Sequence, residues 1–167
     1  SALCRAGYAA QVCLPIMVAP PRDMRAGSLG EAMAKKGYRS YVDVDTIPEV
    51  NTSLVSSGSC ASLVQHYTRV GRTSNWKEGD VVKGNTAIKK GTAIATFVDG
   101  VYQNLEHGNH AALYVSQDDN GIWVVEQWTS LARPQKRKLT FKGKKADGSG
   151  WEDPSNNGDA FSIIELK

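Results

Sequence analysis

The chain has 167 residues, of which 41% are hydrophobic and 22% charged, and its formal net charge is +3. This length corresponds to one domain with a small extension, and it can bury a single hydrophobic core without a metal or disulfide framework. The composition excludes a disordered chain. No apolar run reaches the roughly 18 residues of a membrane-spanning helix, so we expect no membrane insertion.

The first forty residues differ from the rest of the chain. We interpret residues 1–40 as an N-terminal helical extension and residues 41–167 as the main domain. Within the extension, the sequence predicts a helix from Ser28 to Lys36, because Ser28 is a favourable N-cap, Glu31 completes a capping box and a glycine follows.

The chain contains three cysteines, which allow one disulfide and leave one thiol over. Cys4 and Cys13 lie close together in the Ala-rich opening segment, and Cys60 stands apart. A Cys4–Cys13 bridge would fit an extracytoplasmic protein, whereas two buried free thiols would fit small core residues. Both interpretations remain open.

An amphipathic helix is predicted to begin at Cys60. Ser59 is a favourable N-cap, and Gly71 provides a stop after Val70. His66 lies on the opposite, polar face of this helix. The apolar residues that share the face of Cys60 follow it by three, four and seven positions and are Leu63, Val64 and Tyr67.

The remainder of the chain is dominated by strand patterns, separated by turn residues. One helix followed by a run of antiparallel strands predicts an α+β fold, with the helix packed on one face of the sheet. The predicted strands are Thr92–Val98, Ala111–Ser116, Gly121–Trp128, Leu139–Lys142 and Ala160–Leu166.

A cysteine at a helix N-terminus can serve as a nucleophile. The helix dipole and the unpaired N–H groups of the first turn favour a thiolate, and the same N–H groups can stabilise an oxyanion. Cys60 is therefore a candidate catalytic residue. The alternative is that Cys60 is simply a small buried side chain.

His110 is the candidate base for this nucleophile. It follows Gly108 at the start of a predicted strand, and the small residues Ala111 and Ala112 leave space around it. We expect the imidazole to lie on the sheet face that receives the helix. A core histidine without catalytic function is the alternative, and His107 is a competitor in the preceding loop.

A third residue is needed to orient the base. It should come from the strand after His110, where Glu126 and Gln127 are the candidates. Glu126 is the better physical choice, because a carboxylate stabilises an imidazolium more strongly than an amide does. The residue opposite His110 depends on the turn that joins the two strands. A turn at Gln117–Asp119 places Glu126 there, and a turn at Asp118–Asp119 places Gln127 there. A turn at Asn120–Gly121 places Leu131 there.

Seven cations and no acids lie between Arg133 and Lys145, so the rest of the chain is net negative. Such a strip is typical of a solvated loop and of a strand edge protected by lysines. It could also contact an anionic polymer such as the cell wall. With Phe141 as the sole aromatic residue of the strip, nucleic-acid binding is not expected.

No cofactor or metal is expected. The cysteines and histidines do not have the spacing of zinc ligands, and Gly58 precedes Ser59 without the lysine of a phosphate-binding loop.

Five segments together resemble the NlpC- and CHAP-type cysteine peptidases and amidases of the bacterial cell wall, which have a papain-like fold. Within that group the chain is most similar to the small type VI secretion amidase effectors, and the resemblance covers roughly residues 50–130. Trp128 stands where CHAP enzymes usually carry an asparagine. The segments are Gly58–Tyr67, Trp76–Gly79, Gly91–Phe97, Gly108–Ala112 and Gly121–Trp128.

The resemblance implies a peptidoglycan amidase or endopeptidase that hydrolyses an amide bond of the stem peptide or cross-link through a thioester. Cys60 would attack, His110 would act as base and acid, and Glu126 would orient it. The protein would be secreted into a rival's periplasm, and a periplasmic immunity protein would protect the producing cell. Alternatives are a secreted housekeeping peptidase of the cell wall and a catalytically inactive wall-binding module.

Overall fold

A computed structural model describes residues 37–167 of the chain. The helix predicted from Ser28 to Lys36 and the two cysteines of the opening segment therefore lie outside the described residues. The described part begins with an extended segment in which Arg39 forms a β-bridge with Thr92, so this segment is attached to the sheet.

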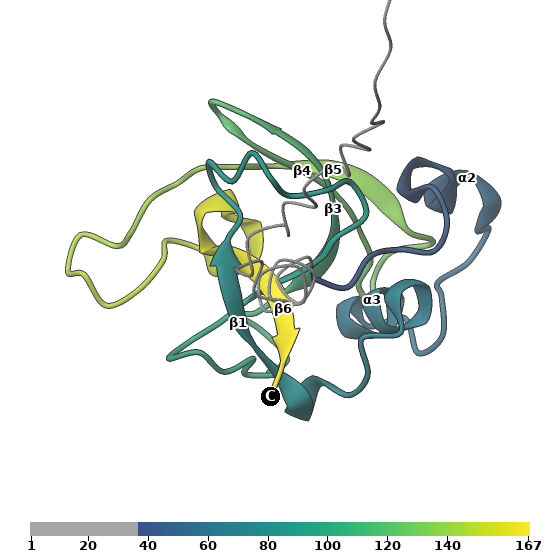
Figure 1. The fold of residues 1–167 in the computed structure, drawn as a ribbon, viewed down its shortest axis with the longest axis horizontal. Coiled ribbons are helices and arrows are strands. Elements are labelled where there is room, and N and C mark those ends of the chain that lie inside the picture. Colours follow the sequence, from purple (N-terminus) through teal and green to yellow (C-terminus); the bar gives the residue numbers. More distant parts are fainter. Residues whose placement is uncertain (1–36) are drawn as a thin grey trace, which may run out of the picture.

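The centre of the molecule is a six-stranded antiparallel sheet with the strand order β1-β6-β2-β3-β4-β5. The two α-helices lie on the right of it in Figure 1, and the loop between β5 and β6 projects on the left. The fold class is α+β, as predicted, and the strands are β1 (Trp76–Val81), β2 (Ala93–Thr96), β3 (Ala111–Asp118), β4 (Gly121–Glu126), β5 (Gln135–Thr140) and β6 (Phe161–Leu166).

Two α-helices precede the sheet in the described part of the chain: α2 (Ile47–Val50) and α3 (Cys60–Thr68). The predicted start of α3 is confirmed, because Ser59 caps it and accepts a hydrogen bond from the backbone N–H of Ser62. The helix ends at Thr68, two residues earlier than predicted, where Arg69 adopts a left-handed conformation. Short 3₁₀ helices are Val44–Thr46, Thr73–Asn75, Pro154–Asn156 and Gly158–Ala160.

Both sides of the sheet are buried. The side that faces α3 contains Ala93 and Ala95 of β2 with Ala111, Leu113 and Val115 of β3, packed against apolar residues of the helix. A second cluster occupies the other side of the sheet, and its members include Ile94, Ala112, Tyr114, Ile122, Val124, Leu139, Phe161 and Ile163.

The turn between β3 and β4 is formed by Asp119 and Asn120, so that Asp118 pairs with Gly121. It is none of the three turns considered from the sequence. The Asp118 carboxylate selects it by accepting hydrogen bonds from the backbone N–H groups of Asn120 and Gly121, at 2.8 and 3.1 Å. Gly121 is required here because an added Cβ would lie 2.3 Å from the carbonyl oxygen of Leu139.

A β-bulge changes the register halfway along this hairpin. Tyr114 pairs with Val124 but Ser116 pairs with Trp123, which leaves Val115 as an extra residue on β3. Because side chains alternate between the faces of a strand, this one-residue shift reverses which residues of the far end share a face.

Two strands differ from the prediction. The strand predicted at Leu139–Lys142 begins earlier, at Gln135. Lysines and arginine before Leu139 are typical of a loop, but β5 lies at the edge of the sheet, where a strand tolerates cations. Strand β1 was not predicted, since its sequence Trp-Lys-Glu-Gly-Asp-Val lacks a clear apolar alternation.

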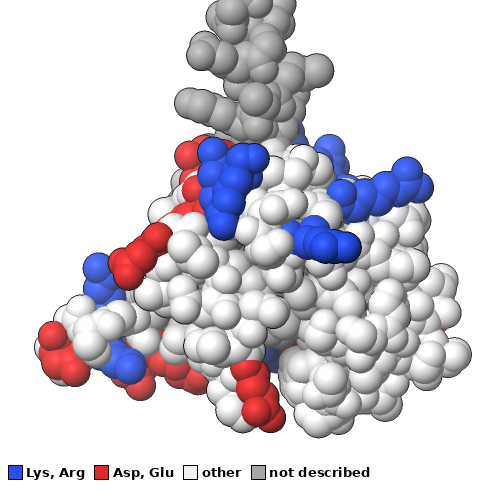
Figure 2. Space-filling view, turned by 90° about the horizontal axis from the view of Figure 1, so that it is seen from below, with Lys and Arg blue, Asp and Glu red and all other residues white. Residues whose placement is uncertain are grey.

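The basic strip is largely paired with acids from other segments. Lys136 contacts Asp45 at 3.0 Å, and two similar pairs connect Lys138 with Asp118 and Lys142 with Asp153, at 2.6 and 2.7 Å. Both signs of charge lie side by side on the left of the face shown in Figure 2. The strip thus behaves mainly as a solvated strand edge. None of the helices between residues 37 and 167 has the length and apolarity needed to cross a membrane.

Candidate active site

Cys60 occupies the first turn of α3. The residue before its cap, Gly58, has a φ of +81°, and a Cβ at this position would lie 2.9 Å from the side chain of Leu54. The chain therefore turns sharply into the helix. The first N–H groups of a helix have no partner within it, so those of Cys60 and Ala61 are available beside the thiol.

Gln127 fixes the loop that leads into α3. Its side chain is fully buried; the amide oxygen accepts a hydrogen bond from the backbone N–H of Val55 at 2.9 Å. The amide nitrogen donates to the carbonyl oxygens of Val55 and Ser59 at 2.8 and 3.0 Å, and also lies 3.3 Å from the Ser62 hydroxyl. Both the amide oxygen and the amide nitrogen are therefore engaged by this loop, and neither is bonded to His110.

His110 directly precedes β3 and is held through its backbone. Its N–H donates to the Thr96 hydroxyl at 2.9 Å, and its carbonyl oxygen accepts from the N–H of Thr96 at 3.0 Å. The loop before it is closed by Asn109, whose side-chain amide bonds both backbone groups of Leu105 at 2.9 and 2.6 Å. The position of the imidazole is thus set by the sheet and by a closed loop.

The expectation that His110 lies on the helix-facing side of the sheet is wrong. Ala111 and Leu113 occupy that side, and His110 alternates with them, so it shares the side of Ala112 and its ring contacts that of Phe161 edge-on. Because His110 lies just before the first strand residue, at the end of the sheet, its imidazole still interacts with the Cys60 thiol and lowers the pKa of that thiol.

Glu126, the last residue of β4, places its carboxylate oxygen Oε2 2.8 Å from Nε2 of His110. The register beyond the bulge puts His110 opposite Trp128, and Glu126 is the diagonal neighbour on the same side. Without the bulge, Gln127 would take this side instead. With Nε2 engaged by the carboxylate, Nδ1 is the nitrogen that remains for the thiol.

Arg137 of β5 binds the far side of the Glu126 carboxylate. Its Nε donates to Oε1 and its Nη2 to Oε2 at 3.2 Å, while Gln135 donates to Oε1 at 3.3 Å. The guanidinium also lies over the Trp128 ring, 5.3 Å from its centroid. Sequence reasoning counted Arg137 only as part of the basic strip; the pairing of β5 with β4 was the signal that would have placed it beside Glu126.

The environment stabilises charged forms of these groups. Burial by itself would raise the pKa of the Cys60 thiol, but the hydrogen bond and charge of His110 lower this pKa to about 7. Burial acts against the imidazolium as well, yet Cys60 and Glu126 together raise the pKa of His110 to about 9. The pKa of Glu126 is lowered despite its burial, because His110 and Arg137 both donate to it.

Tyr102 is a second residue that the sequence did not indicate. Its hydroxyl lies 3.6 Å from Sγ of Cys60 and its side chain is buried. Burial and the neighbouring thiol raise the pKa of this hydroxyl, so it stays protonated and can donate to the sulfur.

A cleft of about 520 Å³ opens beside His110. The loop from Glu106 to Asn109, the side chains of Trp128 and Arg137, and the segment around Asn156 line it. A neighbouring pocket of about 370 Å³ shares Gly108 and Asn109 with this cleft. The cleft therefore gives access to His110 from the surface.

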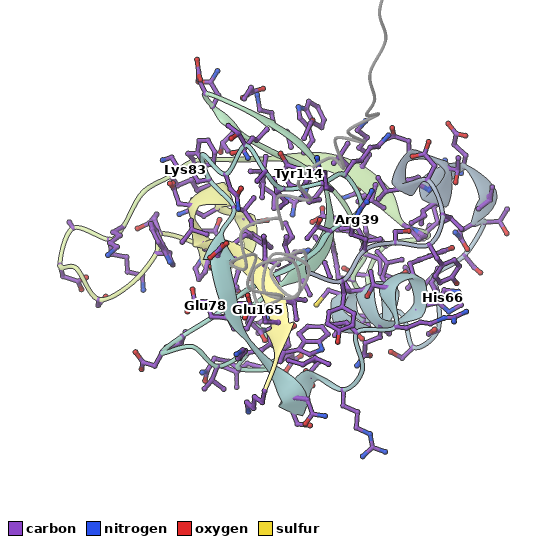
Figure 3. The ribbon with its side chains drawn as sticks, viewed as in Figure 1. Arg39, His66, Glu78, Lys83, Tyr114 and Glu165 are labelled. Carbon is purple, nitrogen blue, oxygen red and sulfur yellow. The ribbon has the colours of Figure 1, made fainter. Side chains whose placement is uncertain are left out.

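The structure brings Cys60, His110 and Glu126 together and keeps the other candidates apart from them. His66 points away from the sheet on the outer face of α3 (Figure 3). His107 is exposed in the loop next to Glu106. Within residues 37–167, no three His, Cys, Asp or Glu side chains are grouped closely enough to hold a metal ion.

Comparisons with known proteins agree with one another. The family model described as "Domesticated amidase effector 2" matches residues 37–164. A "Type VI secretion amidase effector 2 protein" of Salmonella typhi is 46% identical over 112 residues, which cover 64% of this chain and 84% of that protein. "Domesticated amidase effector 2" of Ixodes scapularis is 37% identical over 120 residues, covering 67% and 74%. A solved structure of "Type 6 secretion amidase effector 2 (Tae2)" has a TM-score of 0.68 and 39% identity, covering 77% of this chain and 94% of its own.

Proposed function

The chain belongs to the domesticated amidase effector 2 family of peptidoglycan amidases, and from this premise we propose that it hydrolyses its substrate with Cys60 as a covalent nucleophile. The observation that carries the proposal is the buried 2.8 Å contact of His110 with Glu126, beside a half-buried thiol at a helix N-terminus. A cysteine with this partner and position is activated as a thiolate.

The first half of the reaction forms a thioester. The Cys60 thiolate attacks the carbonyl carbon of a peptide amide, and a C–S bond forms as the carbonyl oxygen becomes an oxyanion. The first-turn N–H groups of α3 stabilise that oxyanion. The C–N bond then breaks, and the departing amine takes its proton from the imidazolium of His110.

The second half releases the acid product. His110, now neutral, removes a proton from water, and the hydroxide adds to the thioester carbonyl. Collapse of this intermediate breaks the C–S bond and restores the thiolate–imidazolium pair. Glu126 keeps Nε2 of the ring engaged through both halves, so that Nδ1 always faces the sulfur.

The biological setting is proposed from the relatives. Two of the similar proteins are named type VI secretion amidase effectors, which implies a toxin that is injected into a competitor and acts on peptidoglycan in the periplasm. The producing cell would then need a periplasmic immunity protein, and the cleft beside His110 is the surface that such an inhibitor would cover.

The test is mass spectrometry of purified muropeptides after incubation with the protein. We expect the wild type to cleave one stem-peptide or cross-link amide, and Cys60→Ala to cleave none. The melting temperature of Cys60→Ala should change little, because a small half-buried side chain leaves only a small cavity.

The control is Ser53→Ala, at an exposed position of the loop that precedes α3, which should retain activity. Cleavage by Cys60→Ala at the wild-type rate would exclude the thioester mechanism. A wild type that binds muropeptides without cleaving them would favour an inactive wall-binding module. Periplasmic expression in a bacterial host then distinguishes a toxin from a housekeeping enzyme by whether cells lyse.

A further inference from the structure

The reaction scheme leaves Arg137 without a role, although its contacts are the most specific in the basic strip. Three nitrogens of its guanidinium are engaged: Nε and Nη2 bind the Glu126 carboxylate, and Nη1 donates to Asn156 at 2.8 Å. The Glu126 side chain has 0% of its surface exposed, compared with 32% for Arg137. The arginine is thus the bridge between a fully buried carboxylate and the cleft.

The thiol and the charged groups around it come from four segments. Cys60 lies on α3, His110 precedes β3, Glu126 ends β4 and Arg137 belongs to β5. Behind Arg137, Asn156 donates to Asp153 at 3.0 Å, and Asp153 is itself neutralised by Lys142 at 2.7 Å. Tyr102 is the remaining titratable group near the sulfur, and its hydroxyl is neutral.

The charges of Cys60, His110, Glu126 and Arg137 sum to zero when the thiol is ionised and the imidazole is protonated. Cys60 and Glu126 are then negative, and His110 and Arg137 are positive. Removal of Arg137 would leave two buried anions facing one cation. An unbalanced buried charge is costly, because solvation by water is lost and is not replaced by an opposite charge.

We propose that Arg137 is a positioning residue that balances the charge of the Cys60–His110–Glu126 set and thereby maintains Cys60 as a thiolate. The arginine touches neither the sulfur nor, in the reaction above, the substrate; its positive charge, held beside Glu126, acts on the set. The catalytic consequence rests on the proposed function, whereas the effect on the thiol does not.

Loss of the arginine has two possible outcomes, and both disfavour the thiolate. If Glu126 stays ionised, its uncompensated field raises the pKa of Cys60. If Glu126 takes up a proton instead, it no longer stabilises the imidazolium that faces the sulfur. The thiolate–imidazolium pair becomes less populated near neutral pH in either case.

The experiment is alkylation of the full chain by iodoacetamide across a pH series, with the Cys60 peptide quantified by mass spectrometry so that Cys4 and Cys13 do not interfere. In Arg137→Met, Cys60 should react roughly fivefold or more slowly at pH 7, as a pKa higher by about one unit implies. Arg137→Lys keeps the charge and should titrate close to the wild type. Lys138→Met, which removes a neighbouring cation from the same strand, should leave the profile unchanged.

A second pair of variants covers the case in which Arg137→Met does not fold. Glu126→Gln and Glu126→Gln/Arg137→Met differ only at the arginine, and neither contains an unpaired buried carboxylate. The double variant should have the higher Cys60 pKa. Equal pKa values within this pair, or a wild-type profile in folded Arg137→Met, would overturn the proposal. Shifted thiol profiles in a protein that cleaves no muropeptide would overturn the enzymatic function and leave the role of Arg137 intact.

Discussion

The pKa values of Cys60 and His110 both shift toward the charged forms, because each group supplies the charge that the other lacks in a buried site. Burial opposes both charged forms, and their mutual contact outweighs it, so that the pKa of Cys60 falls to about 7 and that of His110 rises to about 9. The two groups therefore titrate as a coupled unit. Between these two values the thiolate–imidazolium form, on which the proposed mechanism depends, dominates.

We expect a bell-shaped pH dependence of kcat/KM for muropeptide cleavage. Activity should rise as pH increases through about 7, where Cys60 loses its proton, and fall above about 9, where His110 loses its proton. Stopped assays from pH 5 to pH 10, at intervals of about half a pH unit, measure both limbs. A rising limb that is already complete at pH 5 would indicate a carboxylate in place of the thiol as the group that must ionise.

Replacement of the carboxylate at Glu126 should both slow the reaction and move the upper limb. Glu126→Gln removes the charge that favours the imidazolium, so the pKa of His110 should fall and the upper limb should lie below about 9. We expect kcat/KM to fall on the order of a hundredfold or more, as for other triad carboxylates.

The matched control for this substitution is Glu165→Gln on β6, an acid whose contact is with Lys77 at 3.7 Å, and it should keep the wild-type profile. If Glu126→Gln left both the rate and the upper limb unchanged, Glu126 would be a structural residue and not the group that orients His110.

At the scale of elements, adjacent residues of one strand serve different parts of the site. Glu126 ends β4 and faces His110, whereas the next residue, Gln127, points to the opposite side and holds the loop before α3. The alternation of a single strand thus joins His110 to the Glu126 carboxylate on one face and fixes the loop that leads into α3 on the other.

We expect Gln127→Ala to reduce stability more than it reduces the chemical step. The substitution leaves buried backbone groups of Val55 and Ser59 without partners, which should lower the free energy of unfolding by about 2–4 kcal/mol. Urea denaturation measures this change. Gln103→Ala, at an exposed amide with long 3.4 Å contacts, is the control and should remain within about 0.5 kcal/mol.

A contrary result for Gln127 would be informative. If Gln127→Ala unfolded at the wild-type urea concentration but lost most of its kcat, the amide would act in the reaction itself, for example on the oxyanion.

At the scale of the whole molecule, the sheet order gathers distant parts of the sequence at one end. β3 is central and β5 is at the edge, with β4 between them, so the segments of His110, Glu126 and Arg137 lie next to one another in space. The helix α3 packs against β3 and brings Cys60 to the same end. The rest of the basic strip stays outside this site, where acids neutralise much of it.

The sequence alone was sufficient for the start of α3, for the α+β class and for the choice of Cys60, His110 and Glu126 as candidates. These inferences depend on local rules. Ser59 caps a helix wherever that helix packs, and a carboxylate pairs with an imidazolium better than an amide does.

The tertiary structure alone decided which residue faces His110 and what balances its charge. The turn at Asp119–Asn120 by itself would have directed Gln127 to the histidine, and the bulge at Val115 reversed that outcome. Arg137 became part of the site only because β5 pairs with β4 in the observed register. Strand register is set by packing and by hydrogen bonds between distant segments, and a shift of one residue inverts every face, so no local pattern could have determined it.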